Sequence, residues 1–305
     1  MGFTNPVYGN NFADPQVVAV DNVYYAFATN GPLGNVQTLT SPDLVSWEPV
    51  GDALPALAPW TAPGRVWAPE VAAHAADRYV MYYTSADTAS GRQAIGVAVA
   101  SRPEGPYVDK SPSPLINQVD EGGSIDASPF QDSAGKRWLY WKNDGNAIGV
   151  DTWIYASELP ADGLTLVGPT HRLIKQTLPW EGNLVEAPYM VERNGKFHLF
   201  YSANAFDKAG YAVGHALCES PTGTCTKSGG PLLASSADAA GPGHNMVLHV
   251  GDEDWFAYHA WDPDEVGTDP RGRTMWLSQL TWDGEVPVVQ EALRNNPTRP
   301  GATRA

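Results

Sequence analysis

The amino-acid sequence predicts an all-β protein folded as a five-bladed β-propeller, and three observations support this prediction. A short motif recurs five times along the chain, with its anchor residues at Asp14, Glu70, Asp126, Glu186 and His244. Consecutive anchors are 56 to 60 residues apart, a period that is typical of propeller blades. Each anchor is followed by two apolar, aromatic-rich runs separated by a polar turn, which is the pattern of a β-hairpin.

Each repeat therefore supplies the two inner strands of one blade. In chain order, the expected strand pairs are 16–20 with 23–27, 71–74 with 79–83, 129–131 with 138–141, 189–191 with 197–201, and 246–249 with 255–258. A third strand is expected where another apolar run follows, as in 94–100 and 211–217. The fourth, outer strand is harder to place from the sequence. The 30 Gly, 13 Tyr and 11 Trp residues suit an all-β, turn-rich chain. Most of the tryptophans are expected to pack between blades.

A closed ring of five blades would use nearly the whole chain and leave no exposed sheet edge. We therefore expect one catalytic domain over residues 1–290, followed by a C-terminal tail or strap over 291–305. The first strand of each blade lines the central axis, so that the residues at its start converge at one end of the channel. Asp14, Asp126 and Glu186 are thus expected to share one pocket although they are far apart in the sequence.

The charge of the chain excludes several classes of partner. The formal net charge is −15, which disfavours nucleic acid, because phosphates require a basic surface. The same charge disfavours anionic membranes, and no apolar run is long enough for a transmembrane helix. A neutral polymer remains compatible with this surface. We expect a monomer.

Two cysteines bear on the cellular location. Cys218 and Cys225 flank a short polar segment and are expected to form a disulfide across the end of a hairpin, which would favour secretion. Two reduced structural cysteines are the alternative. No signal peptide is visible, but a leader removed earlier would leave the same sequence. A secreted or periplasmic location is therefore preferred to a cytoplasmic one.

The three carboxylates match a known chemical requirement. Cleavage of a glycosidic bond needs one carboxylic acid to protonate the leaving oxygen and a second carboxylate to activate water or attack directly. A third carboxylate nearby raises the pKa of the acid by repulsion of like charges. A single Asp beside proline is more often a turn residue, but three such motifs in phase with a five-fold repeat favour a site. Serine-hydrolase, zinc-protease and nucleotide-binding motifs are absent from the sequence.

Several short motifs together resemble one enzyme family. They are Asn5-Pro6, Phe12-Ala13-Asp14-Pro15, the segment 41–47 with its Asp-Leu-x-x-Trp pattern, Val66-Trp67-Ala68-Pro69-Glu70, the segment 125–130, and Val185-Glu186-Ala187-Pro188. They resemble glycoside hydrolase family 43, inverting five-bladed propeller enzymes that act on arabinose- and xylose-containing polysaccharides. The resemblance extends from Asn5 to about Val289. Fructan and sucrose hydrolases also use Asp, Asp and Glu, but the residues around their acidic groups differ from those found here.

The resemblance implies a role for each carboxylate. Asp14 would be the general base, Glu186 the general acid, and Asp126 the residue that tunes the pKa of the acid and orients the sugar. In an inverting enzyme the base and the acid stand roughly 6.5–9.5 Å apart, which leaves room for a water molecule.

Further site residues are predicted with alternatives. His244 would lie on the axis near a structural calcium ion, although a hydrogen-bonded histidine without metal is equally compatible and calcium prefers oxygen ligands. Arg273 would reach the sugar, or else form a surface salt bridge. The remaining candidates to line the sugar site, each of which is also compatible with packing, are Phe12, Trp67, Trp141 and Asn183. No cofactor is expected to be required.

The expected substrate is a plant cell-wall oligosaccharide or polysaccharide. The preferred activity is an exo-acting α-L-arabinofuranosidase on arabinan or on arabinose branches of hemicellulose. β-D-Xylosidase and endo-arabinanase are the alternatives, and the absence of a C-terminal β-sandwich after the propeller disfavours one subgroup of xylosidases. A glycan-binding propeller lectin and a protein-binding repeat scaffold are the non-enzymatic alternatives. Neither would need all three carboxylates.

Overall fold

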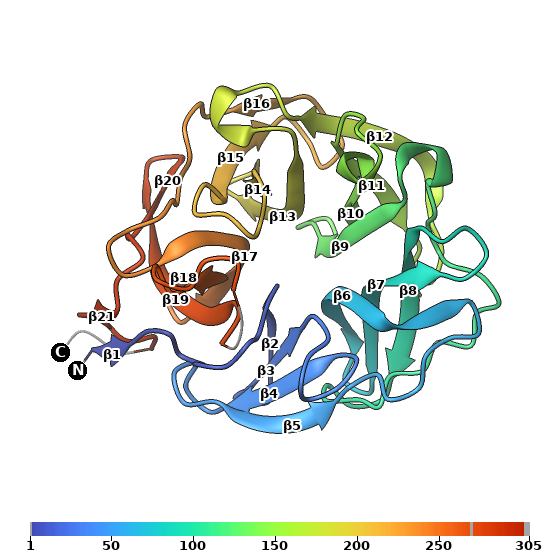
Figure 1. The fold of residues 1–305 in the computed structure, drawn as a ribbon, viewed down its shortest axis with the longest axis horizontal. Coiled ribbons are helices and arrows are strands. Elements are labelled where there is room, and N and C mark those ends of the chain that lie inside the picture. The colour runs from blue at the N-terminus through green and yellow to red at the C-terminus, as the bar shows by residue number, and fades with distance from the viewer. Residues whose placement is uncertain (1, 269–270, 302–305) are drawn as a thin grey trace.

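The computed structural model describes residues 2–268 and 271–301, which form a ring of five β-sheets around a central axis (Figure 1). This confirms the predicted five-bladed propeller. Each sheet is antiparallel and its strands follow one another in sequence order, with the first strand nearest the axis. Within the described residues the only helical elements are three short 3-10 turns, namely η1 (Val119–Glu121), η2 (Gly145–Ala147) and η3 (Pro179–Glu181).

The blades are numbered in chain order. Blade I contains β2 (Gln16–Val20), β3 (Val23–Ala28), β4 (Gln37–Ser41) and β5 (Glu48–Asp52). Blade II contains β6 (Thr61–Ala75), β7 (Arg78–Asp87) and β8 (Gln93–Ala100). Blade III contains β9 (Ser124–Gln131), β10 (Arg137–Asn143), β11 (Trp153–Leu159) and β12 (Val167–Lys175). Blade IV contains β13 (Val185–Arg193), β14 (Lys196–Ala203), β15 (Ala212–Cys218) and β16 (Cys225–Lys227). Blade V contains β17 (Ala240–Val250), β18 (Glu253–Trp261), β19 (Thr274–Asp283) and β20 (Val286–Val289).

Blade II explains why the outer strands were hard to predict. Its sheet has three strands, and the outer edge of β8 is met by isolated bridges from Val99 to Val108, from Ile95 to Ile116 and from Gln93 to Gly123. The segment beyond β8 therefore contacts the sheet at single points instead of forming a regular strand. Outer strands lie far from the axis and carry little of the apolar pattern that identifies the inner ones.

The hydrophobic core is divided into five clusters, one at each contact between neighbouring blades. Representative pairs within the clusters are Val17 with Trp255, Phe27 with Tyr83, Ile95 with Trp141, Ile154 with Tyr201, and Phe200 with Phe256. Large aromatic side chains dominate these contacts because each buries a wide apolar area. The clusters hold the blades together and thereby fix the positions of the inner strands.

The two ends of the described chain meet beside blade V. The short strand β1 (Phe3–Thr4) pairs antiparallel with β21 (Asn295–Asn296), and the Asn5 N–H donates to the Arg294 carbonyl at 2.7 Å. Residues 302–305 of the predicted tail lie outside the described residues, and a domain boundary at 290 stays a prediction. In blade IV, Cys218 and Cys225 lie opposite each other on β15 and β16 and form the expected disulfide.

None of the described helices has the length and apolar character that a membrane span requires.

Candidate active site

A backbone feature recurs within or just before every inner strand. One residue there adopts the left-handed conformation, namely Asp14 (φ 58°), Ala68 (φ 41°), Asp126 (φ 59°), Ala187 (φ 50°) and His244 (φ 50°). For a residue other than glycine this conformation is disfavoured and persists only when its surroundings hold it in place. Two of the predicted anchors are therefore out of phase. Glu70 lies two positions after the equivalent residue, and Glu186 lies one position before it.

Hydrogen bonds between blades hold these left-handed residues. In four cases the backbone N–H donates to a side chain near the end of the second strand of the preceding blade: Ala68 to Thr29 Oγ1 (2.9 Å), Asp126 to Thr84 Oγ1 (3.2 Å), His244 to Ser202 Oγ (2.8 Å), and Asp14 to His259 Nδ1 (3.1 Å). In the fifth case the N–H of Ala187 donates instead to the carboxylate Oδ2 of Asp126, at 3.0 Å.

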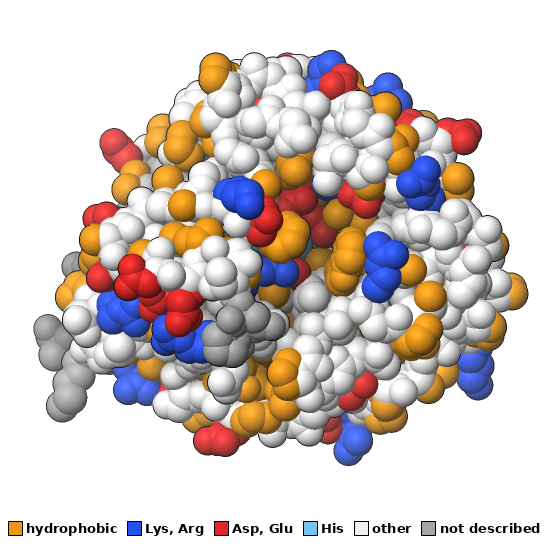
Figure 2. Space-filling view, in the orientation of Figure 1, with side chains coloured by type: hydrophobic (Ala, Val, Ile, Leu, Met, Phe, Trp, Pro, Cys, Tyr) orange, Lys and Arg blue, Asp and Glu red, His pale blue; other side chains and the backbone are white. Residues whose placement is uncertain are grey.

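The three predicted carboxylates converge on one tyrosine that the sequence analysis missed. Tyr211 directly precedes β15, is 1% exposed, and donates its hydroxyl to Glu186 Oε1 at 2.7 Å. Burial raises the pKa of Tyr211 well above its usual range, and the charges of Glu186, Asp14 and Asp126 raise it further. All three carboxylates therefore lie close enough to act on the same phenol. Figure 2 shows the ring hollowed at its centre, with acidic side chains inside the hollow.

Asp14 is a buried carboxylate surrounded by donors and positive charge. Its Oδ1 accepts a hydrogen bond from Arg273 at 2.8 Å and lies 3.3 Å from His244 Nδ1, while Thr29 donates to its Oδ2. Burial alone would raise the pKa of Asp14, but Arg273, His244 and His259 outweigh burial and hold the pKa well below its usual range. Asp14 is consequently ionised over the whole mildly acidic and neutral range.

Asp126 differs from Asp14 although both occupy the left-handed position. Burial raises the pKa of Asp126 to about 7, with Glu186 and Asp14 adding to the rise and His244 and Lys142 opposing it. Among the described residues, its side chain accepts one hydrogen bond, which the N–H of Ala187 donates. A carboxyl in this environment gains and loses its proton near neutral pH, and it does so together with its neighbours.

Glu186 is held from two sides. Tyr211 donates to Oε1, and the ammonium of Lys142 lies 3.3 Å from Oε2. Lys142 has a side chain with no exposed surface, and its Nζ also donates to Asn146 Oδ1 at 2.6 Å. A second acid, Asp144, lies 3.8 Å from the same Nζ. The buried ammonium of Lys142 is thus shared by Glu186, Asn146 and Asp144.

Glu70 is a further buried carboxyl in the inner strand of blade II. Burial raises the pKa of Glu70 well above its usual range, the nearby Asp126 adds to the rise, and a hydrogen bond of 3.0 Å from Ser128 opposes it. A neutral acid at this position avoids a further negative charge beside Asp126.

Arg273 and His244 both contact Asp14. Arg273 directly precedes β19, and Phe206 covers its guanidinium at 4.5 Å from the ring centroid. Among the residues that the structure describes, no group of three or more His, Cys, Asp or Glu side chains is arranged to hold a metal ion. Calcium near His244 stays a prediction, and no step proposed below uses it.

Two of the predicted sugar-contacting residues are in the core instead. Phe12 is 0% exposed and packs edge-on against Tyr8, with 5.5 Å between ring centroids. Trp141 is 1% exposed and stacks on Tyr155 at 5.7 Å. Both side chains fill contacts between blades, which disfavours contact with a sugar, and their predicted role stays a prediction.

Trp67 and Asn183 remain at the surface. Trp67 is half-buried in β6, and the guanidinium of Arg65 lies 5.4 Å from its ring centroid. Asn183 is exposed in the turn before β13. Both positions are compatible with contact to a sugar, and their roles stay predictions.

The residues that the sequence analysis missed share one location. Lys142, Tyr211 and His259 lie at the second or third strands, whereas the search for motifs followed the first strands. A lysine that ends the aromatic run Trp138–Lys142 is the one signal that would have pointed to the site, because a charge at the end of a buried strand needs partners.

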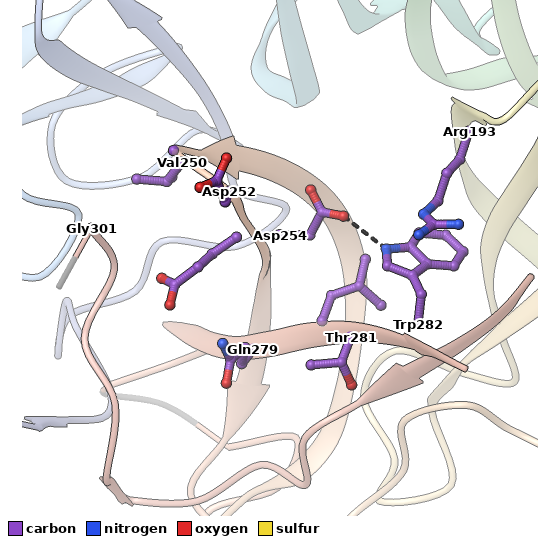
Figure 3. A pocket seen from close by; sticks show the side chains of 11 residues that line it. Arg193, Val250, Asp252, Asp254, Gln279, Thr281, Trp282 and Gly301 are labelled. Atoms are coloured by element: carbon purple, nitrogen blue, oxygen red, sulfur yellow. Dashed lines mark hydrogen bonds between the residues drawn. The ribbon is translucent and has the colours of Figure 1, made fainter. Parts of the chain in front are cut away.

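Another hollow lies at the opposite end of the strands. It has a volume of about 680 Å³ and is lined by the β17–β18 turn and the end of β19 (Figure 3). Within it, Asp254 accepts a hydrogen bond of 2.7 Å from the indole of Trp282, and the Arg193 guanidinium lies 4.8 Å from the same indole. The three carboxylates do not line this hollow. It therefore has no part in the candidate active site.

A propeller with three acidic side chains grouped at one end of its axis contains the carboxyl groups that glycoside hydrolysis requires. Comparison with known proteins gives the family. The sequence profile described as "Glycosyl hydrolases family 43" matches residues 3–287. The chain belongs to glycosyl hydrolase family 43 and is a glycosidase.

Individual relatives agree with this assignment but differ in substrate. A β-D-galactofuranosidase of Aspergillus niger is 30% identical over 285 residues, which cover 88% of this chain and 79% of that protein. An extracellular exo-α-(1→5)-L-arabinofuranosidase of Streptomyces chartreusis is 29% identical over 295 residues, which cover 88% and 85% of the two chains. The crystal structure of a thermostable family-43 glycoside hydrolase superposes with a TM-score of 0.88 at 30% identity over 99% of both chains.

Proposed function

We propose that this glycosidase releases L-arabinofuranose from arabinan or arabinose-substituted hemicellulose with inversion of configuration. Asp14 is the general base and Glu186 the general acid in this proposal. The observation that carries it is the grouping of three carboxylates: Glu186 accepts from Tyr211, Asp126 accepts from the N–H of Ala187 next to Glu186, and Asp14 contacts His259, on which Tyr211 stacks. The pKa of Asp14 is held below its usual range and that of Asp126 is raised, and carboxyls with pKa values pushed apart are typical of acid–base sites.

In the proposed reaction, Asp14 accepts a proton from the water that attacks the anomeric carbon. The lowered pKa of Asp14, which Arg273 and His244 maintain against burial, keeps this carboxylate ready to accept a proton. Glu186 donates a proton to the leaving oxygen as the glycosidic bond breaks. Asp126 contributes negative charge beside the acid and orients the sugar. The proton taken up by Asp14 and the proton lost by Glu186 balance over one turnover.

The choice of L-arabinofuranose rests on the relatives. Besides the Streptomyces chartreusis enzyme, a second relative named as an extracellular exo-α-(1→5)-L-arabinofuranosidase, from Streptomyces avermitilis, is 27% identical over 93% of this chain. The word "extracellular" in both names supports secretion of this chain, as does the Cys218–Cys225 disulfide. The proposed partner is a plant cell-wall polysaccharide, and we propose that the enzyme acts as a monomer.

A second substrate has a specific observation in its favour. The relative that is 30% identical is named a β-D-galactofuranosidase. Both sugars are five-membered rings, and galactofuranose carries an additional exocyclic hydroxymethyl group. A hydrophobic pocket discriminates one extra carbon by only about 10–200-fold, so the two activities are close alternatives at one site.

A panel of chromogenic aryl glycosides tests the proposal. It contains the α-L-arabinofuranoside, the β-D-galactofuranoside and the β-D-xyloside, each assayed with the unmodified enzyme and with Glu186→Ala. Preferred hydrolysis of the arabinofuranoside, lost in the variant except with highly activated leaving groups, supports both substrate and site. Preference for the galactofuranoside or the xyloside would overturn the substrate. No hydrolysis of the three aryl glycosides, together with release of oligosaccharides from arabinan, would indicate an endo-arabinanase. No hydrolysis of either the aryl glycosides or arabinan would indicate a lectin.

A further inference from the structure

Blade III departs from a hydrogen-bonding rule that the other four blades obey at the axis. In those blades the residue near the end of the second strand carries a hydroxyl or an imidazole, which accepts the N–H of the next blade's left-handed residue; these residues are Thr29, Thr84, Ser202 and His259. In blade III the corresponding residue is Lys142, which pairs across the strand with Ile125, next to Asp126. An ammonium group has three donors and no acceptor. Lys142 therefore cannot accept the N–H of Ala187.

Two consequences follow for the carboxylates. The N–H of Ala187 donates instead to Asp126 Oδ2, at 3.0 Å. Lys142 Nζ lies 3.3 Å from Glu186 Oε2, one residue before Ala187. A single lysine thus brings a positive charge to Glu186 and leaves Asp126 bonded to the neighbouring peptide.

We propose that Lys142 is a positioning residue that holds Glu186 in place as the proton donor and fixes it relative to Asp126. The inference rests on the proposed role of Glu186 as general acid. Lys142 is well suited to this role because its side chain has no exposed surface and Asn146 Oδ1 fixes its ammonium from another side at 2.6 Å. A buried lysine with several acceptors is confined to one place, whereas an exposed lysine is mobile.

The charges around Glu186 oppose one another. Lys142 favours its ionised form, while Asp126 and Asp144 raise the cost of a further negative charge nearby. Tyr211 donates to Oε1, and the charge of Asp14 also acts on the Tyr211 hydroxyl. Arg65 and Arg92 act on Asp144, and His244 acts on Asp126. Loss of Lys142 would remove the one buried cation in direct contact with Glu186 and would leave the acidic groups in excess.

Leaving-group dependence distinguishes a positioning role from a purely structural one. Glycosides of dinitrophenol need little protonation of the leaving oxygen, whereas phenyl glycosides need it fully. For Lys142→Met we expect kcat/KM to fall by about 10²-fold on the phenyl substrate and by less than about tenfold on the dinitrophenyl substrate. An equal loss on both substrates would overturn the proposal.

The pH profile gives a second readout, and a matched lysine supplies the control. Removing the positive charge beside Glu186 should move the alkaline limb of kcat/KM to higher pH by about half a unit or more, in Lys142→Met and equally in Lys142→Gln. The glutamine variant retains a hydrogen-bond donor and serves if the methionine variant does not fold. Lys227→Met removes another largely buried lysine, which bonds Glu181 in η3 and the Lys175 carbonyl in blade III. This control should lower stability without moving the limb.

The possible results distinguish failure of the inference on Lys142 from failure of the proposed function. If Glu186→Ala shows the leaving-group dependence and the Lys142 variants show neither that dependence nor the shifted limb, the inference on Lys142 is wrong and the proposed function stands. If Glu186→Ala itself loses activity equally on all leaving groups, the proposed function fails first. The positioning role is supported if the Lys142 variants show both the leaving-group dependence and the shifted alkaline limb, and Lys227→Met shows neither.

Discussion

The guanidinium of Arg273 donates a hydrogen bond to Asp14 Oδ1 at 2.8 Å, so that blade V neutralises a carboxylate at the start of blade I. These two residues are almost as far apart in the sequence as the chain allows. The ring of Phe206, from the loop between β14 and β15, covers the other side of the guanidinium. This contact therefore joins the two blades that close the ring and also sets the electrostatics of the proposed base.

The Arg273→Gln variant should require a higher pH for activity. Arg273 helps to hold the pKa of Asp14 below its usual range against burial, so its removal lets that pKa rise. The proposed base is then protonated up to a higher pH, and the acidic limb of kcat/KM should move upward by about one unit or more. Arg271→Gln is the matched control, because Arg271 is exposed and pairs with Asp262 and Glu265. If the acidic limb does not move in Arg273→Gln, Arg273 does not set the pKa of the proposed base.

The Asp126→Asn variant should change the opposite limb. Burial raises the pKa of Asp126 to about 7, and the charges of Glu186 and Asp14 add to the rise, so Asp126 and Glu186 act on each other electrostatically. Replacing it by a neutral amide removes repulsion that favours a proton on Glu186. The alkaline limb of the pH profile should therefore fall at lower pH, which kcat/KM measured between about pH 5 and 9 would reveal. An unchanged profile would remove Asp126 from this role.

The Gly243→Ala variant should damage the site through Tyr211. A Cβ atom at Gly243 would overlap the Tyr211 ring, which also stacks on His259 with an interplanar angle of 3°. Because Tyr211 bonds Glu186, we expect a loss of about 1–3 kcal/mol in unfolding free energy and at least about tenfold in kcat. Gly230→Ala is the control, since nothing lies within 4 Å of the added atom. Full activity of Gly243→Ala would argue against a role for the phenol.

Two buried histidines should make the fold sensitive to acid. His198 Nδ1 lies 3.1 Å from His215 Nε2 in blade IV, and burial together with His198 lowers the pKa of His215 to about 4. The folded pKa is below the unfolded value of about 6.5, so the unfolded chain binds more protons in between. The stability contributed by neutral His215 is present above about pH 6.5 and is lost as the pH falls toward about 4.

Urea unfolding at several pH values measures this effect. The His215→Gln variant should flatten the pH dependence of the unfolding free energy in that window by up to about 1.4 kcal/mol per pH unit. His249→Gln is the control, because the His249 side chain is 72% exposed. If the two variants lose stability in parallel as the pH falls, the buried pair does not cause the sensitivity.

The sequence predicted the ring and the grouping of three carboxylates because both depend on the inner strands, whose apolar pattern is strong. It misplaced the phase of two motifs, since the left-handed residue in blades II and IV is Ala68 and Ala187 and no acidic residue marks it. It placed Phe12 and Trp141 on the sugar site, because aromatic residues near an anchor look alike whether they line a pocket or fill a contact between blades.

The sequence did not predict the partners of the carboxylates, for a different reason. Lys142 and His259 come from the second strand of the preceding blade, and Tyr211 directly precedes the third strand of the blade that carries Glu186, so their contacts arise only when the strands and blades pack together. A single sequence gives the positions of such residues along the chain but not which blade they face.

The stereochemistry of the first product tests the central claim most directly. Proton NMR recorded during the first minutes of hydrolysis of the α-L-arabinofuranoside, or of the β-D-galactofuranoside if that is preferred, identifies the anomer released before it equilibrates. With Asp14 activating water opposite Glu186, the account predicts the inverted anomer: β-L-arabinofuranose or α-D-galactofuranose. Initial release of the retained anomer would mean that a carboxylate attacks the sugar directly, and would contradict the assignment of Asp14 as general base.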